Sequence, residues 1–141
     1  MNPLPAAPGS AQAVVELSRA DCLQLLAACT YGRVVFTERA LPAAHPVSYL
    51  LDAEEVVFRT AGGGKLAAAT LRNIVAFQVD HIDAETETGW SVLGVGQAYE
   101  VTDPARLMAL MPRLPRPWGA QAVAGHVIAI PLGRLTGRRL G

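Results

Sequence analysis

The sequence predicts a mainly β (α+β) protein of one domain: a six-stranded antiparallel barrel, closed or split, with short flanking helices. Three observations predict this fold class. Six short segments are rich in strand-forming residues, turn residues separate most of them, and short helical patterns stand at the start, in the middle and near the end. The length of 141 residues fits one domain. The six predicted strands are residues 31–37, 43–51, 55–60, 73–80, 90–101 and 126–131.

The N-terminal part of the chain predicts a tail followed by a capped helix. Residues 1–14 are rich in proline, alanine and glycine and are expected to be disordered, because they cannot contribute to a core. The folded domain then spans residues 15–141. Ser18 is a typical helix N-cap, and apolar residues at helical spacing continue to near Thr30. We therefore expect a helix between these two residues.

Turn residues join the first three predicted strands into hairpins. Residues 38–40 and 52–54 are short turns between strand-forming segments. Pro46 lies in the second strand, and because proline has no amide hydrogen to donate, we expect an edge strand or a bulge there. Gly94 and Gly96 predict a bend in the fifth strand.

Two further helices are predicted. Residues 65–70 are rich in alanine and follow a glycine run. Residues 104–111 begin with a proline, which is favoured in the first helical turn, and Thr102 or Asp103 supplies the cap. Residues 112–119 contain three prolines and are expected to be irregular.

The charges balance in number but not in position. Twelve basic and 12 acidic residues give a formal net charge of zero, which argues against a general nucleic-acid binder. Acidic residues gather in residues 80–88, which we expect to form a loop. No acid follows Asp103, and residues 136–141 are expected to be an arginine-bearing tail. This basic end suits a small anion or an acidic patch on a partner subunit, and a solvated surface is equally compatible.

Other features indicate a cytoplasmic protein without a membrane span or a metal site. Cys22 and Cys29 lie about two helical turns apart, too far for a disulfide, and are expected to be small buried residues. No apolar run is long enough to cross a membrane, and the N-terminus lacks the features of a signal peptide. The histidines at positions 45, 81 and 126 show no spacing typical of metal ligands.

The sharpest local feature is a glycine run between a strand and a helix. Gly62, Gly63 and Gly64 follow the third strand, and Arg59 and Lys65 bracket them. Glycines let successive backbone amides face one concavity, and the two cations can neutralise a phosphate. The spacing is not that of a P-loop. The segment therefore predicts an anion site, with a plain turn from strand to helix as the alternative.

Several segments together carry a resemblance to a known family. They are His45-Pro46-Val47-Ser48-Tyr49, Val56-Val57-Phe58-Arg59-Thr60, Gly64-Lys65, Gly89-Trp90-Ser91-Val92, Gly96 and Thr136-Gly137-Arg138-Arg139. In this order and spacing they resemble the pyridoxamine 5′-phosphate oxidase-like family of flavin-binding split β-barrels. The resemblance covers residues 16–140 approximately. It implies a split barrel that assembles as a homodimer and binds FMN.

The resemblance also implies which residues contact the cofactor. Four lie on the second strand, against the flavin ring. Four on the third strand and its loop hold the phosphate, and two come from the long strand of the second subunit. In that order they are Pro46, Val47, Ser48, Tyr49, Arg59, Thr60, Gly64, Lys65, Trp90 and Ser91. Trp118 and the C-terminal arginines lie where family members often complete the pocket.

The implied function is an FMN-binding oxidoreductase that transfers hydride or electrons to an unidentified small molecule. The arginine–histidine motif that authentic pyridoxamine phosphate oxidases carry near the C-terminus is not found, which argues against that activity. A deazaflavin-dependent reductase of the same fold and a non-enzymatic module binding flavin or haem remain alternatives. No catalytic residue is assigned.

Overall fold

The computed structural model describes residues 13–61, 64–117 and 125–141. The expectations for residues 1–12 and for Trp118 lie outside the described residues. Val14, at the end of the expected tail, already begins a strand.

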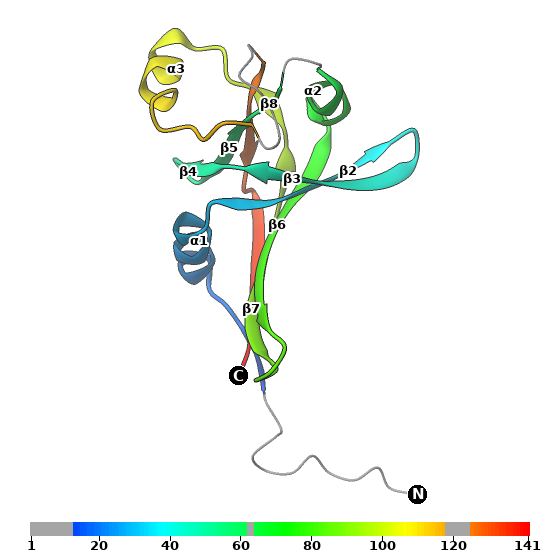
Figure 1. Ribbon diagram of the computed structural model, residues 1–141, viewed down its shortest axis with the longest axis vertical. Coiled ribbons are helices and arrows are strands. Elements are labelled where there is room, and N and C mark those ends of the chain that lie inside the picture. The colour runs from blue at the N-terminus through cyan, green and yellow to red at the C-terminus, as the bar shows by residue number, and fades with distance from the viewer. Residues whose placement is uncertain (1–12, 62–63, 118–124) are drawn as a thin grey trace, which may run out of the picture.

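Ten strands in the described residues form two antiparallel sheets, which confirms the predicted fold class, an antiparallel split barrel (Figure 1). The six-stranded sheet has the order β1-β10-β7-β6-β2-β3 and the four-stranded sheet the order β4-β5-β9-β8. The first sheet contains β1 (Val14–Glu16), β2 (Tyr31–Glu38), β3 (Leu41–Ser48), β6 (Ile74–Asp83), β7 (Thr88–Gln97) and β10 (Arg134–Leu140). The second contains β4 (Leu50–Asp52), β5 (Glu55–Arg59), β8 (Tyr99–Glu100) and β9 (Val127–Pro131).

Three helices pack around these sheets: α1 (Arg19–Ala28), α2 (Lys65–Thr70) and α3 (Pro104–Leu110). Both predicted caps are confirmed. The Ser18 side chain accepts a hydrogen bond from the Asp21 amide at 3.1 Å. Asp103 accepts one from the Arg106 amide at 3.1 Å, which decides between the two cap candidates. In the described residues no helix has the length and apolar character needed to cross a lipid bilayer.

The structure has more strands than the six predicted. Two of the predicted strands are each divided between the two sheets, as β3 with β4 and as β7 with β8. The expected C-terminal tail is instead β10, which pairs along its length with β7 and also with β1. This strand was missed because its arginines break the apolar alternation, which a strand exposed to solvent does not need.

The acidic segment was expected to be a loop, but in the structure it forms the end of a long hairpin. β6 continues to Asp83 and β7 begins at Thr88, with Asp83 paired opposite Thr88. The prediction was wrong because acidic residues dominate the segment, yet backbone pairing extends the ladder past the core. This hairpin carries the sheet to the far end of the molecule, near the C-terminus (Figure 1).

The two predicted hairpin turns are confirmed as two-residue connections. Arg39 and Ala40 have φ of 51° and 64°, and Ala53 and Glu54 have φ of 49° and 58°. Positive φ at both central residues matches the right-handed twist of the flanking strands. Pro46 lies on β3, which is an edge strand, as its missing amide hydrogen predicted.

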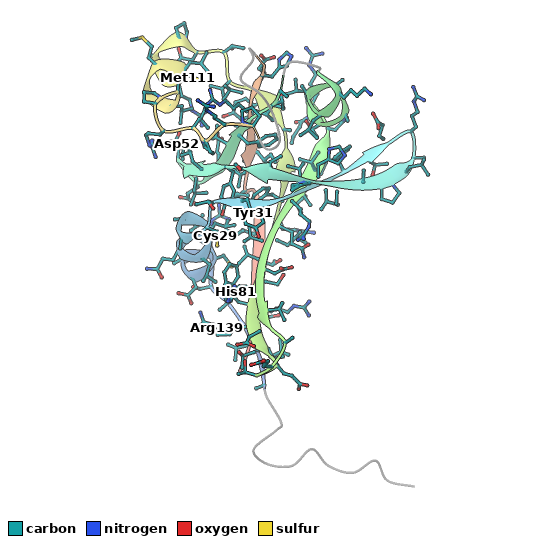
Figure 2. The ribbon with its side chains drawn as sticks, in the orientation of Figure 1. Cys29, Tyr31, Asp52, His81, Met111 and Arg139 are labelled. Atoms are coloured by element: carbon teal, nitrogen blue, oxygen red, sulfur yellow. The ribbon has the colours of Figure 1, made fainter. Side chains whose placement is uncertain are left out.

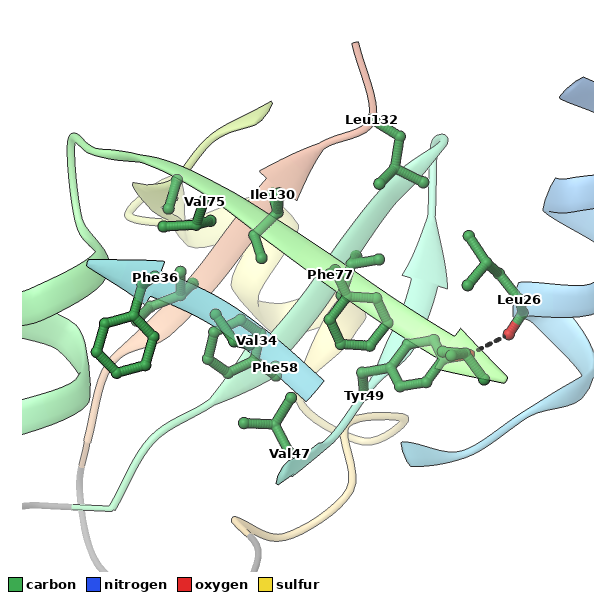
Figure 3. Packing of buried hydrophobic residues seen from close by; sticks show 14 of the residues in the cluster. Leu26, Val34, Phe36, Val47, Tyr49, Phe58, Val75, Phe77, Ile130 and Leu132 are labelled. Carbon is green, nitrogen blue, oxygen red and sulfur yellow. Dashed lines mark hydrogen bonds between the residues drawn. The ribbon is translucent and has the colours of Figure 1, made fainter. Parts of the chain in front are cut away.

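The core lies between the two sheets and under α1 (Figure 3). Phe58 from the four-stranded sheet and Phe77 from the six-stranded sheet are fully buried. A Cβ atom added at Gly96 would lie 1.8 Å from the Pro131 carbonyl oxygen, so this glycine permits the close approach of β7 to the end of β9. A second apolar cluster under α3 includes Leu110 and Leu114.

Candidate functional site

A cleft of about 470 Å³ opens where the two sheets and α2 meet. This volume lies in the range of small-molecule and cofactor sites. Its lining comes from β3, the end of β5, the start of α2 and the segment after α3. The lining residues are His45, Pro46, Val47, Arg59, Thr60, Ala61, Gly64, Lys65, Leu66 and Pro117.

The structure brings together six of the ten residues predicted to contact a cofactor. They are Pro46, Val47, Arg59, Thr60, Gly64 and Lys65. The first two come from the six-stranded sheet, Arg59 is the last residue of β5 in the four-stranded sheet, and Thr60 directly follows it. The cleft therefore joins the strand expected to meet a ring with the loop expected to hold a phosphate.

Arg59 is the last residue of β5 and is held from one side. Its Nε donates a hydrogen bond to the Pro115 carbonyl oxygen at 3.0 Å. Because a guanidinium is planar, this bond fixes the plane of the group while the two Nη nitrogens lie at its other edge. Those two nitrogens form the donor fork that matches a phosphate or a carboxylate.

Thr60 is buried, and His126, the residue just before β9, accepts and donates hydrogen bonds that set the direction of its hydroxyl. Its amide donates to the His126 carbonyl oxygen at 2.8 Å, and its Oγ1 accepts from the His126 amide at 3.2 Å. An oxygen that accepts this bond still has its own proton to donate. A Cβ at Gly125 would lie 1.8 Å from the Thr60 carbonyl oxygen, so glycine is required for this approach.

Gly64 and Lys65 supply the other side of the predicted anion site. Gly64 has a φ of 74°, in the left-handed region that favours glycine, and leads directly into α2. No side chain caps this helix. In the part of the chain that the structure describes, no carboxylate forms an ion pair with Lys65 or Arg59. The two cations can therefore receive an anionic ligand without first losing a partner.

The β3 side of the cleft is largely apolar. Because β3 is an edge strand, part of its backbone hydrogen-bonding capacity faces away from β2. The His45 ring makes an edge contact with Phe36, with ring centroids 5.2 Å apart. His45, Ala61, Leu66 and Pro117 were missed as lining residues. His45 directly precedes the predicted ring-contacting run, whereas Pro117 reaches the cleft by a long-range contact that no local pattern shows.

Ser48 and Tyr49 do not line the cleft. Ser48 is half-buried at the end of β3. Tyr49 belongs to the core, and its hydroxyl donates to the Leu26 carbonyl oxygen at 2.5 Å (Figure 3). Burial, with a smaller contribution from Cys29, raises the pKa of Tyr49 well above the ordinary value of 10.0. Its hydroxyl is thus occupied by the fold.

Trp90 and Ser91 lie on β7, away from the cleft. As neighbours on one strand they place their side chains on opposite faces of the six-stranded sheet. Trp90 packs against the main core cluster, whereas Ser91 lies between Asp80 and Arg138 on the other face. Arg139, which pairs with Trp90, also lies on the lower part of the sheet, far from α3 and Met111 (Figure 2).

The described residues contain no group of three or more histidines, cysteines or carboxylates placed to hold a metal ion. The cleft instead combines two cations, a hydroxyl and an apolar wall with an edge strand. This set fits a ligand with a flat apolar part and a phosphate.

Comparison with known proteins identifies relatives with this architecture. The family model described as pyridoxamine 5′-phosphate oxidase matches residues 18–139. An uncharacterized protein of Mycobacterium tuberculosis is 41% identical over 140 residues, which cover 96% of this chain and 91% of the relative.

Two solved structures from Mycobacterium smegmatis are similar. An FAD-binding protein has a TM-score of 0.78 and 35% identity, and the match covers 89% of this chain and 98% of that one. An FAD- and haem-binding protein has a TM-score of 0.69, and the match covers 87% of this chain and 72% of that one. At 16% sequence identity, this similarity shows a shared fold alone. On the family match and the sequence identity, the chain belongs to the pyridoxamine 5′-phosphate oxidase family.

Proposed function

We propose that the cleft binds a flavin nucleotide, with FMN as the preferred candidate, and that the protein is a flavin-dependent oxidoreductase. The observation that carries the proposal is the pair of cations, Arg59 and Lys65, which line a cleft with an apolar wall and form no ion pair with any carboxylate of the described residues. The similarity to an FAD-binding protein at 35% identity supports a flavin. FMN and FAD share the ring and the inner phosphate, so the same residues would bind both.

The chain's own residues would bind and orient the cofactor. Arg59 and Lys65 would pair with the phosphate, and Thr60 would donate its hydroxyl proton to a phosphate oxygen. The free edge of β3 at Pro46 and Val47 would offer backbone groups to the ring edge. When bound, a flavin supplies the acceptance and release of hydride or single electrons. No acid–base pair of the protein is required for that chemistry.

A homodimer completes this proposal. Exposed apolar residues lie on one face of the six-stranded sheet, here called the open face, and they include Tyr31, Ile74, Ile82 and Leu93. Such a surface is typical of a protein–protein interface. A cross-strand row on this face runs from Leu93 through Gln78 and Arg33 to Pro46, which lines the cleft.

This row makes the open face continuous with the rim of the cleft. A second copy seated on the open face would therefore reach the bound cofactor. Because Ser91 faces that side and Trp90 faces the core, the partner would contribute Ser91 rather than Trp90. An isologous dimer of this kind is the commonest symmetric assembly.

The visible absorption spectrum tests the cofactor proposal. The purified protein is measured alone and again after FMN or FAD has been added and the sample desalted. Retained bands at about 370 and 450 nm are expected for a bound oxidised flavin. A colourless protein that retains neither nucleotide would contradict the proposal. Retention of deazaflavin instead, or a haem Soret band, would identify the alternative cofactors.

Oxidation of a reduced nicotinamide in the presence of the bound flavin tests the enzymatic part. We expect the absorbance of NADH or NADPH to fall only when FMN is present. Tight flavin binding without turnover with either nicotinamide would favour a non-enzymatic binding module.

Light scattering tests the dimer. We expect twice the single-chain mass of 14.9 kDa at micromolar concentration. Leu93→Arg places a charge on the open face and should give the single-chain mass. Met108→Arg is the control, because Met108 is also apolar and exposed but lies on α3. A single-chain mass for the unaltered protein would refute the dimer.

A further inference from the structure

Residues 104–117, here called the α3 strap, run along the four-stranded sheet from one end of β5 to the other (Figure 1). Near its start the strap bonds to Glu55, the first residue of β5. Near its end it bonds to Arg59, the last residue of β5. The strap therefore connects a polar cluster remote from the cleft with a cation of the anion site.

The start of the strap is fixed by a cluster of charged and phenolic groups. Arg106 donates from Nη1 to the Tyr99 hydroxyl at 2.6 Å and from Nη2 to Glu55 Oε1 at 2.9 Å and Asp52 Oδ2 at 3.3 Å. The Tyr99 hydroxyl in turn donates to Glu55. Arg113 adds an ion pair with Asp52 at 3.6 Å. Two carboxylates and a phenol thus hold one guanidinium from several directions.

The middle of the strap is fixed by apolar packing. Leu110 and Leu114 are buried in the second cluster, against Val57 of β5 and Val127 of β9. The Leu114 amide also donates to the Leu110 carbonyl oxygen at 2.9 Å. The chain just before Pro115 is therefore held to the sheet by both its side chain and its backbone.

The end of the strap enters the cleft. The Pro115 carbonyl oxygen accepts the Arg59 Nε bond, and Pro117 is a lining residue. Within the described residues, the Arg59 side chain forms this one hydrogen bond. The direction of the Arg59 fork thus depends on the position of the strap.

We propose that Arg106 is a positioning residue for the anion site. It anchors the α3 strap, and through Pro115 the strap orients the guanidinium of Arg59 toward the cleft. The contacts form one contiguous chain from Asp52 and Glu55 to Arg59. The identity of the anion as a flavin phosphate rests on the proposed function, whereas the orientation of Arg59 does not.

The first measurement needs no ligand. NMR follows the exchange with water of the Arg59 Nε proton, which its bond to Pro115 protects. Arg106→Met should speed this exchange at least about tenfold, as expected when a hydrogen bond of ordinary strength is lost. Arg19→Met is the matched control, because Arg19 also bonds a glutamate and a backbone carbonyl but lies on α1. Unchanged exchange in folded Arg106→Met would overturn the proposal.

The second measurement compares FMN with riboflavin, which lacks the phosphate. Arg106→Met should raise the dissociation constant for FMN by about tenfold, the effect of misplacing one charged donor. The constant for riboflavin should stay unchanged, and Arg106→Lys should restore part of the FMN affinity. Equal weakening of both ligands would indicate a general loss of structure and would contradict a positioning role.

The two measurements also separate this proposal from the proposed function. Flavin binding that is absent from the unaltered protein refutes the function, and proton exchange alone then decides the role of Arg106. If Arg106→Met does not fold, Arg113→Gln loosens the same strap through a more exposed ion pair. It should give the same changes with smaller size, and no change in exchange would again refute the proposal.

Discussion

Arg106 and Arg59 lie at opposite ends of strand β5 and differ in their bonding partners. Arg106 bonds the first residue of the strand, and Arg59 is its last residue. Arg106 bonds two carboxylates and a tyrosine, all within the protein. Arg59 bonds one backbone oxygen and, like Lys65, has no carboxylate partner among the described residues. Where the chain supplies the counter-charge, the arginine stabilises the fold. Where it does not, the cation remains available to a ligand.

The pKa of Arg106 reflects this pairing. Burial alone would lower it, but hydrogen bonds and charge interactions with Tyr99 and Glu55 outweigh burial and raise the pKa. The guanidinium is therefore charged at every pH at which the protein is folded. Its removal would leave Glu55, which is mostly buried, without its cation, and Asp52 would keep only the longer ion pair with Arg113.

Arg106→Met should have the largest effect on the fold. We expect the free energy of unfolding to fall by about 2–4 kcal/mol, because the mostly buried Glu55 loses its cation and Asp52 loses the shorter of its two ion pairs. Chemical denaturation measures the change. Arg19→Met, which breaks a pair exposed on both sides, should cost less than about 1 kcal/mol. Equal losses of unfolding free energy in the two variants would contradict the view that Arg106 stabilises the fold more than the exposed Arg19 does.

Lys65→Ala should show the opposite behaviour. FMN binding should weaken by about 1–3 kcal/mol, the range for a hydrogen bond to a charged group. Riboflavin binding and the free energy of unfolding should barely change, because Lys65 is exposed and unpaired with any acid of the described chain. Isothermal titration with both ligands provides the test. A similar loss for riboflavin would assign Lys65 to the ring instead of the phosphate.

Tyr49→Phe should have the smallest effect at neutral pH and a distinct effect at high pH. Loss of the hydroxyl bond to Leu26 should cost about 1 kcal/mol. Because the folded state raises the pKa of Tyr49 above 10.0, it holds the phenolic proton more tightly than the unfolded state does. The contribution of Tyr49 to stability is therefore full below pH 10 and falls as the pH rises further.

The stability of the variant should decline less steeply above pH 10, because it keeps only the contributions of Tyr99, Cys22 and Cys29, whose pKa values burial also raises. Thermal melts from pH 8 to pH 11 or so measure both slopes. Identical slopes would show that Tyr49 does not titrate with unfolding. FMN affinity should be unchanged, since the hydroxyl lies in the core and not in the cleft.

The sequence predicted those parts of the fold and site that depend on neighbouring residues. Ser18 and Asp103 act on amides three positions away, so their caps were visible in the chain. Arg59 and Lys65 bracket one loop, so their convergence followed from local order. The antiparallel barrel followed from alternating strands and turns.

What could not be predicted depends on contacts between distant segments. β10 is a strand because β7 supplies its hydrogen-bond partners, and its own residues show no apolar alternation. The bond from Arg59 to Pro115 spans 56 positions and has no sequence pattern. The strand β7 was predicted, but the faces taken by Trp90 and Ser91 follow from the register of pairing.

The affinity of the unaltered protein for FMN relative to riboflavin tests the central claim most directly. The claim is that two cations without protein counter-charges receive the phosphate of a flavin. Two charged donors should make FMN bind at least about a hundredfold more tightly than riboflavin, and the ratio should shrink as salt is added. Equal affinities at low salt would contradict the account, because the cleft would then recognise the ring without using Arg59 and Lys65.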